Sequence, residues 1–199
     1  MENTSELRCQ LALIAHRMFE RRLTDMAGGN LSARAGEHIL ISPRYSGSRK
    51  HWQLEPDDFV EGPLQGDEIL SDPRMSREGK AHLAIYRLFP NVNGIIHAHP
   101  FHILPFAAAS RPIPPVLEDT QKFGTIPVAS YAPAHSADLA ANVVALLREQ
   151  EKALQAQAAA VILPTHGIIV AGKDIFAAID ALERIDWNAW CILAMKTLG

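Results

Sequence analysis

The segment from Gly94 to His99 places the strongest single constraint on how this chain folds. It reads Gly-Ile-Ile-His-Ala-His and is followed at once by Pro100. A short apolar run that ends at a proline is typical of a buried β-strand, and alternate residues of a strand point to the same face. The segment therefore predicts a buried strand whose end carries two imidazoles, those of His97 and His99, side by side.

The rest of the chain alternates short apolar runs with segments of helical periodicity, and neither an internal repeat nor a linker divides it. We therefore expect one mixed α/β domain spanning residues 1–199. Helices are predicted at residues 5–22, from about 76, at 103–109, from an N-cap at Ser136 to about 151, and from an N-cap at Asp174 to near the C-terminus. Further strands are predicted at residues 31–34, 38–42, 126–129, 159–163 and 167–171.

The charge balance argues against a general attraction to polyanions. The chain holds 19 basic and 22 acidic side chains, a formal net charge of −3, so we expect neither nucleic acid nor a membrane as a partner. No apolar run approaches the roughly 20 residues that span a bilayer. The first ten residues contain no apolar leader segment, and Cys9 and Cys191 are the only cysteines. We therefore expect a cytoplasmic protein with two free thiols.

A third histidine extends the pair into a candidate metal site. His166 lies in a predicted turn between two apolar strands, where a side chain can leave the edge of a sheet. Three imidazoles with one open position are typical of a catalytic zinc site, whereas structural zinc sites have four protein ligands. The alternative is that His97 and His99 are ordinary core or surface histidines. The histidines that we do not assign as ligands are His16, His38, His51, His82, His102 and His135.

Glu78 is an acidic residue close to a predicted helix start, in the segment Ser-Arg-Glu-Gly-Lys. A carboxylate at that position complements the helix dipole. His82 lies four residues later on the same helix face, where the two side chains could interact. A surface glutamate without a functional role would fit the position as well, so helix physics alone leaves the role of Glu78 open.

Three separate segments favour an anion. The turn Gly28-Gly29-Asn30 can turn backbone amides toward a negative group, the loop from Pro43 to Lys50 is rich in arginine and serine, and Ser76-Arg77 precede a helix start. Together they predict one pocket for a phosphate or a carboxylate. The alternative is that these are solvated loop charges.

Five segments in this order resemble the class II aldolase/adducin family, and its L-fuculose-phosphate aldolases in particular. They are GGNLSAR, ILISPRYSG, SREGKAH, GIIHAHP and ILPTHGIIVAGKD, which run from residue 28 to about 174. The resemblance implies a three-layer α/β/α sandwich with a central, mainly antiparallel sheet covered by helices. It also implies a homotetramer with active sites between subunits.

The resemblance carries functional roles to particular positions of this chain. It implies one zinc ion per subunit, with Mn²⁺, Fe²⁺ or Co²⁺ as alternatives, on His97, His99 and His166. It implies that Glu78 binds the metal in the resting enzyme and moves a proton once the substrate displaces it. The implied contacts to a small anionic sugar substrate are Gly29, Asn30, Arg44, Ser46, Gly47, Ser76 and Arg77.

The implied reaction is aldol cleavage of a small phosphorylated ketose through a metal-stabilised enediolate. Decarboxylation of a sugar-acid phosphate, 4-epimerisation and dehydration are alternatives within the family, and a non-catalytic adducin-like interaction domain is a remote one. Arg44-Tyr45 and Arg77 depart from the family pattern at the anion site and favour a firmly bound phosphate or carboxylate. The catalytic tyrosine of fuculose-type aldolases has no match, so Glu118 or Asp119 is expected as the second acid/base.

Overall fold

A six-stranded sheet forms the centre of the computed structural model, which describes residues 4–198. Its strand order is β3-β2-β1-β4-β6-β5, and every neighbouring pair is antiparallel. The strands are β1 (Asn30–Ala35), β2 (His38–Ile41), β3 (Val60–Pro63), β4 (Gly94–Ala98), β5 (Ala158–Leu163) and β6 (Gly167–Gly172). The predicted histidine strand, β4, therefore lies in the middle of the sheet between β1 and β6.

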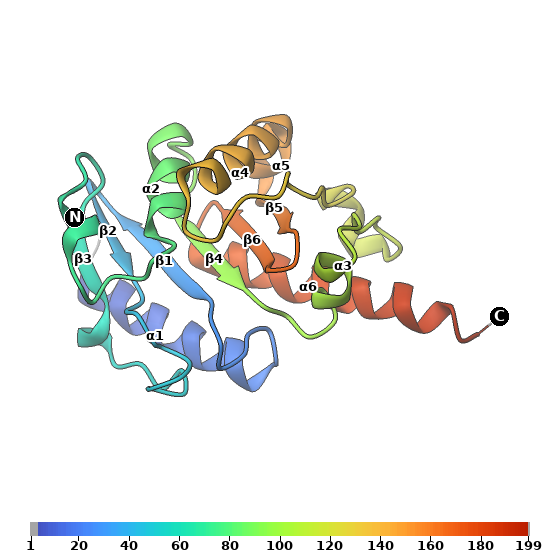
Figure 1. Cartoon of the computed structure of the whole chain (residues 1–199), viewed down its shortest axis with the longest axis horizontal. Coiled ribbons are helices and arrows are strands. Elements are labelled where there is room, and N and C mark those ends of the chain that lie inside the picture. The colour runs from blue at the N-terminus through green and yellow to red at the C-terminus, as the bar shows by residue number, and fades with distance from the viewer. Residues whose placement is uncertain (1–3, 199) are drawn as a thin grey trace.

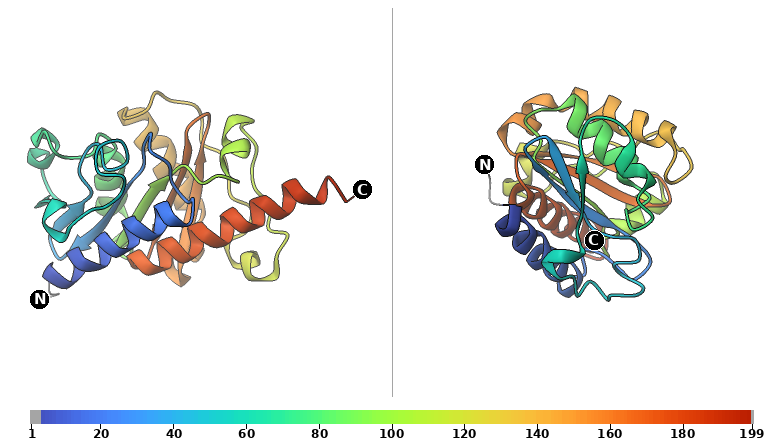
Figure 2. Two further views of the ribbon diagram at one scale, coloured as in Figure 1. Left: turned by 90° about the horizontal axis from the view of Figure 1, so that it is seen from below. Right: turned by 90° about the vertical axis from the view of Figure 1, so that its left-hand side faces the viewer.

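Helices cover both faces of this sheet, as Figures 1 and 2 show. One face packs against α1 (Thr4–Glu20) and α6 (Ile175–Met195), and the other against α2 (Gly79–Leu88) and α4 (Ala137–Glu149). Along β4, Ile96 belongs to the first core and Ile95 to the second, which is the alternation that a two-sided strand requires. The predicted three-layer α/β/α architecture is confirmed.

Shorter elements connect these layers. They are α3 (Leu104–Ala108), α5 (Glu151–Ala156) and the 3₁₀ helices η1 (Pro56–Asp58), η2 (Glu68–Ser71) and η3 (Glu118–Phe123). None of the helices within residues 4–198 is long and apolar enough to cross a membrane. Cys9 and Cys191 are both free.

Two predicted helix starts are confirmed by their capping bonds. The backbone N–H of Leu139 donates to the Ser136 hydroxyl over 3.1 Å, and that of Ala177 donates to the Asp174 carboxylate over 2.7 Å. Each bond satisfies an amide that the first helical turn leaves free. The helix expected from about residue 76 begins only at Gly79, so Glu78 immediately precedes it.

Two strand predictions need correction. Residues 126–129 form no strand; Ile126 and Val128 make isolated bridges to Ile113 and Ile162. Pro127 between them has no N–H to donate to a ladder. The edge strand β3 was not predicted, because its sequence, Val-Glu-Gly-Pro, holds two residues that are rare inside strands.

Candidate active site

Three histidines meet at one end of the central strands. His97 belongs to β4, His99 follows the end of β4, and His166 lies in the turn between β5 and β6. Because β4 pairs with β6, with His97 opposite Ile169, this turn is held beside the end of β4. One ring nitrogen of each histidine lies within 4.8 Å of the others. This spacing suits three imidazole ligands of one metal ion.

The hydrogen bonds of two of these rings leave the opposite nitrogen available. Nδ1 of His97 lies 3.1 Å from the carbonyl oxygen of Ile168, and Nδ1 of His99 lies 3.1 Å from the Asp25 carboxylate. Nε2 of His99 is buried and has no hydrogen-bond partner within the described residues. An oriented ring with a buried, unpaired nitrogen is what a metal ligand requires.

The environment also favours neutral imidazoles, the form that binds metals. Burial lowers the pKa of His97 well below its usual value, and positive charge on His166 and His99 would lower it further. Burial, and then the neighbouring His99 and His135, lower the pKa of His166 to about 4. At neutral pH the lone pairs of His97 and His166 are therefore free.

The predicted glycine turn packs directly against the histidines. A Cβ atom on Gly28 would lie 2.8 Å from Cε1 of His99. Gly29 has a φ of +103° and faces the hydroxyl of Thr24, which a Cβ would approach to 2.7 Å. Glycine at position 28 lets the backbone approach the imidazole, and glycine at position 29 adopts the positive φ without strain.

Glu78 is buried, with 4% of its surface exposed, and faces His135. Its Oε1 lies 2.7 Å from Nδ1 of His135. Burial raises the pKa of Glu78 to about 7, although a hydrogen bond from the backbone amide of His135 and the charge of Arg77 act in the opposite direction. The interaction expected between Glu78 and His82 is absent; Nδ1 of His82 lies 2.6 Å from the hydroxyl of Ser32 instead.

The anion-favouring segments surround a cavity of about 210 Å³ that the three histidines and Glu78 also line. The side chains of Arg44 and Arg77 make no ion pair or hydrogen bond within residues 4–198, although Arg44 lies over the ring of Tyr45. Oδ1 of Asn30 is buried there without a partner. All predicted substrate contacts line this cavity: Gly29, Asn30, Arg44, Ser46, Gly47, Ser76 and Arg77.

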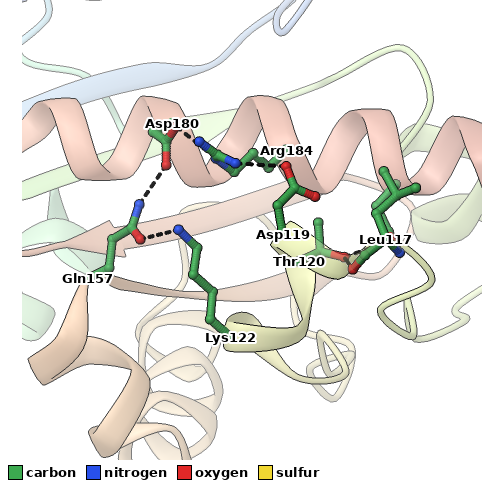
Figure 3. A network of polar contacts seen from close by, with 8 residues as sticks. Leu117, Asp119, Thr120, Lys122, Gln157, Asp180 and Arg184 are labelled. Carbon is green, nitrogen blue, oxygen red and sulfur yellow. Dashed lines mark hydrogen bonds and ion pairs between the residues drawn. The ribbon is translucent and has the colours of Figure 1, made fainter.

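Glu118 and Asp119 are not brought to this cavity. Both are exposed residues of η3, and Asp119 forms a 2.7 Å ion pair with Arg184 of α6. Figure 3 shows this pair within a network that continues from Arg184 through Asp180 and Gln157 to Lys122. In the chain itself, Asp119 therefore joins η3 to α6.

Sequence reasoning missed two residues of the site, Asp25 and His135. Asp25 accepts from the amides of Ala27 and Gly28 as well as contacting His99. An acid just before a glycine turn is a recognisable signal for such a role. His135 precedes the N-cap of α4, and its sequence context carried no comparable signal. Burial, and then the charges of Arg77 and Arg44, lower its pKa.

Comparison with known proteins agrees with this arrangement. The sequence model of the class II aldolase and adducin N-terminal domain matches residues 9–193. The chain belongs to the class II aldolase/adducin family. An L-fuculose phosphate aldolase of Methanococcus maripaludis strain C7 is 32% identical over 178 residues, which cover 86% of this chain and 89% of the relative.

Other relatives of this class II aldolase differ in reaction. A 3-oxo-tetronate 4-phosphate decarboxylase of Pectobacterium atrosepticum is 24% identical and covers 98% of this chain and 87% of its own. A solved L-fuculose 1-phosphate aldolase superposes with a TM-score of 0.83 at 24% identity, over 98% of this chain and 88% of that one. The family and the fold are therefore shared, while the relatives' named reactions diverge.

Proposed function

We propose that this class II aldolase is a zinc enzyme that cleaves a carbon–carbon bond of a small phosphorylated ketose. The observation that carries the proposal is the convergence, around one cavity, of three imidazoles, one buried carboxylate and two unpaired guanidinium groups. Imidazole ligands suit zinc, and Mn²⁺, Fe²⁺ and Co²⁺ are the alternatives.

The metal would be held by His97, His99 and His166. Their fit is supported by the buried, unpaired Nε2 of His99 and by the hydrogen bonds that fix the rings of His97 and His99. When bound, the metal would supply Lewis-acid stabilisation of the negative charge that develops on the substrate oxygens.

Glu78 would move the proton that bond cleavage requires. Its carboxylate is buried at the cavity wall, and Oε1 has no hydrogen-bond partner within residues 4–198. A carboxylate held in this way can accept a proton from the substrate and return it. Its further role as a metal ligand in the resting enzyme is part of the same proposal.

Other residues of the same cavity would hold the phosphate. Arg44 and Arg77 are cations without an acidic partner, and the Gly28–Asn30 turn and Ser76 present polar groups to the same cavity. Guanidinium groups bind phosphate by paired, charge-assisted hydrogen bonds. Binding energy at this remote group would fix the orientation of the reacting carbons.

The two arginines also favour a second candidate, decarboxylation of a sugar-acid phosphate. A guanidinium binds a carboxylate as readily as a phosphate, and one relative is named for decarboxylating 3-oxo-tetronate 4-phosphate. In that reaction the broken carbon–carbon bond releases carbon dioxide. The same metal and the same proton-transferring residue would serve both outcomes.

We further propose a homotetramer in which the second acid/base comes from a neighbouring subunit. Glu118 and Asp119 are exposed and lie outside their own chain's cavity, and Asp119 is engaged by Arg184. Glu118 is therefore the better candidate of the two. Mixed oligomers of Glu78→Gln and Glu118→Ala chains should regain activity that neither variant has alone; no recovery would contradict a shared site.

The deciding experiment is a product assay on the zinc-loaded enzyme. L-fuculose 1-phosphate, other ketose 1-phosphates and 3-oxo-tetronate 4-phosphate are supplied in turn. Dihydroxyacetone phosphate from a ketose 1-phosphate would support the aldolase proposal, and carbon dioxide from the oxo acid would support the decarboxylase. Turnover that is undiminished after the metal is removed by a chelator would contradict both.

A further inference from the structure

His135 has a left-handed backbone conformation in the loop before α4. Its φ is +68°, in the left-handed region that few non-glycine residues adopt. It immediately precedes Ser136, whose hydroxyl already caps α4. A glycine or an asparagine would follow the same path at lower conformational cost. Strain of this kind is retained where a side chain is needed at one place.

The side chain of His135 is aimed at Glu78. Nδ1 of the imidazole lies 2.7 Å from Oε1 of the carboxylate. Neither atom has a partner in hydrogen-bond geometry within residues 4–198. About a third of the imidazole is exposed, while only 4% of the carboxylate is. Both side chains line the cavity, and the half-buried imidazole contacts the buried carboxylate there.

In this structure Glu78 lies next to His135 and not among the three histidines that would hold the metal. The ligand atoms of His97, His99 and His166 form the compact group of three, and the Glu78 carboxylate does not belong to it. All five side chains nevertheless line the same cavity. The carboxylate thus has a position off the histidine group as well, and His135 contacts it there.

We propose that His135 is a positioning residue, whose imidazole holds the Glu78 carboxylate at the cavity in the position that it takes when it is off the metal. This inference rests on the proposed function, because it assigns His135 to the residue that would move the proton. His135 acts through Glu78, so its removal should lower kcat and leave the metal ligands intact.

Two substitutions distinguish the effect of losing the imidazole from the effect of the backbone conformation. His135→Gly removes the side chain and accepts the left-handed φ. His135→Asn also tolerates that φ, and its amide nitrogen can occupy the place of Nδ1, so a donor toward Glu78 is kept. Ser110→Gly is the matched control, since Ser110 is exposed, has a φ of +49° and lies outside the cavity.

His135→Gly is expected to lower activity without lowering stability. His135→Gly should lower kcat about 10- to 100-fold with little change in KM, as is usual for residues that orient a reacting group. Its melting temperature should stay unchanged or rise by up to about 4 °C. Bound zinc should remain at the wild-type level, His135→Asn should recover part of the kcat, and Ser110→Gly should share only the thermal effect.

A lower melting temperature, a loss of zinc or an unchanged kcat in His135→Gly would each overturn the inference. So would equal activity of the Gly and Asn variants. The double variant Glu78→Gln/His135→Gly should be no slower than Glu78→Gln alone, because one residue acts through the other. If Glu78→Gln keeps full turnover, the proposed function fails; if only His135→Gly does, the positioning role fails alone.

Discussion

Two sets of polar side chains are buried equally well in this molecule but differ in how completely they are bonded. On α6, Asp186 and Asn188 are 5% and 2% exposed; at the cavity, Glu78 and Asn30 are 4% and 2% exposed. Burial alone therefore does not distinguish the two sets. Their hydrogen bonds do.

The α6 set is satisfied throughout. Oδ1 of Asn188 accepts from the amides of Val116 and Leu117 and from the hydroxyl of Thr120 at 2.8–3.1 Å, and Nδ2 donates to the carbonyl of Pro114. Asp186 accepts from two backbone amides and from Nδ1 of His102. These side chains tie the segment after β4 and the loop before η3 to α6.

The cavity set is left open in the same structure. Oδ1 of Asn30, Oε1 of Glu78 and Nε2 of His99 are buried and make no hydrogen bond among the described residues, although Oε1 of Glu78 lies 2.7 Å from Nδ1 of His135. An unsatisfied buried polar atom destabilises a fold, by about 1–3 kcal/mol each. Several that face one cavity are therefore best explained by a ligand that completes them. Buried polar side chains with all their hydrogen bonds made therefore indicate a structural role, whereas buried polar atoms that converge on one cavity without hydrogen bonds indicate a functional one.

The largest expected effect is the loss of bound zinc when a histidine is removed from the cavity. His97→Ala should lower bound zinc from about one ion per chain to below roughly a tenth of that, because two imidazoles do not make a stable zinc site. His102→Gln is the matched control from the satisfied set and should keep its zinc while losing stability. Elemental analysis after dialysis measures both. Full zinc occupancy in His97→Ala would refute the assignment.

Glu78→Gln should cause the largest loss of activity at the least structural cost. Turnover should fall by about 10²–10⁴-fold, because the amide cannot exchange a proton. The melting temperature of the metal-free protein should not fall, since a neutral amide is easier to bury than a carboxylate. Asp186→Asn is the control: its Oδ1 can keep the two backbone amides, but its NH2 group would replace the oxygen that faces Nδ1 of His102, so it should lose stability. A melting temperature lowered equally in both variants would contradict the difference between the cavity residues and the α6 residues.

An asparagine pair tests the same comparison on stability alone. Asn188→Ala leaves two backbone amides and one carbonyl without partners and should lower the free energy of unfolding by about 3 kcal/mol, or roughly 6–12 °C in melting temperature. Asn30→Ala removes a side chain whose Oδ1 is already unpaired and should cost less than about 1 kcal/mol. Denaturant unfolding of the metal-free proteins measures both, and similar losses would contradict the comparison.

Much of the fold followed from local sequence because its signals are local. Ser136 and Asp174 cap their helices through amides three residues away, and the apolar run before His97 is short enough to be only a strand. The orientation of His97 followed from strand periodicity. A local signal was also overlooked. Residues 126–129 had a strand-like apolar pattern, but Pro127 has no N–H to donate to a ladder there.

The residues at the cavity also show what local sequence signals cannot predict. His135 contacts Glu78 across 57 positions of the chain, and no periodicity links a loop before one helix to the residue before another. Asp25 reaches His99 across 74 positions in the same way. The side-chain interaction considered between Glu78 and His82 does not form, because Glu78 immediately precedes α2 and its carboxylate faces His135. Local rules identified the proposed ligands, whereas the residues that contact them depend on the assembled fold.

The smallest expected effect concerns polar groups that are bonded but exposed. Glu61 on β3 binds Arg8 of α1 at 2.7 Å and His38 of β2 at 3.1 Å, with 35% of its side chain exposed. Hydrogen bonds from His38 and then Arg8 lower its pKa below the usual 4.5. A lowered carboxyl pKa stabilises the fold above the unfolded value, and the gain is lost as the pH falls through the folded value. Glu61→Gln should therefore cost under about 1 kcal/mol at pH 7 and less than that at about pH 3. Chemical unfolding at both pH values tests this, and a loss at pH 7 as large as that of Asn188→Ala would mean that bonding, without burial, makes a polar group structural.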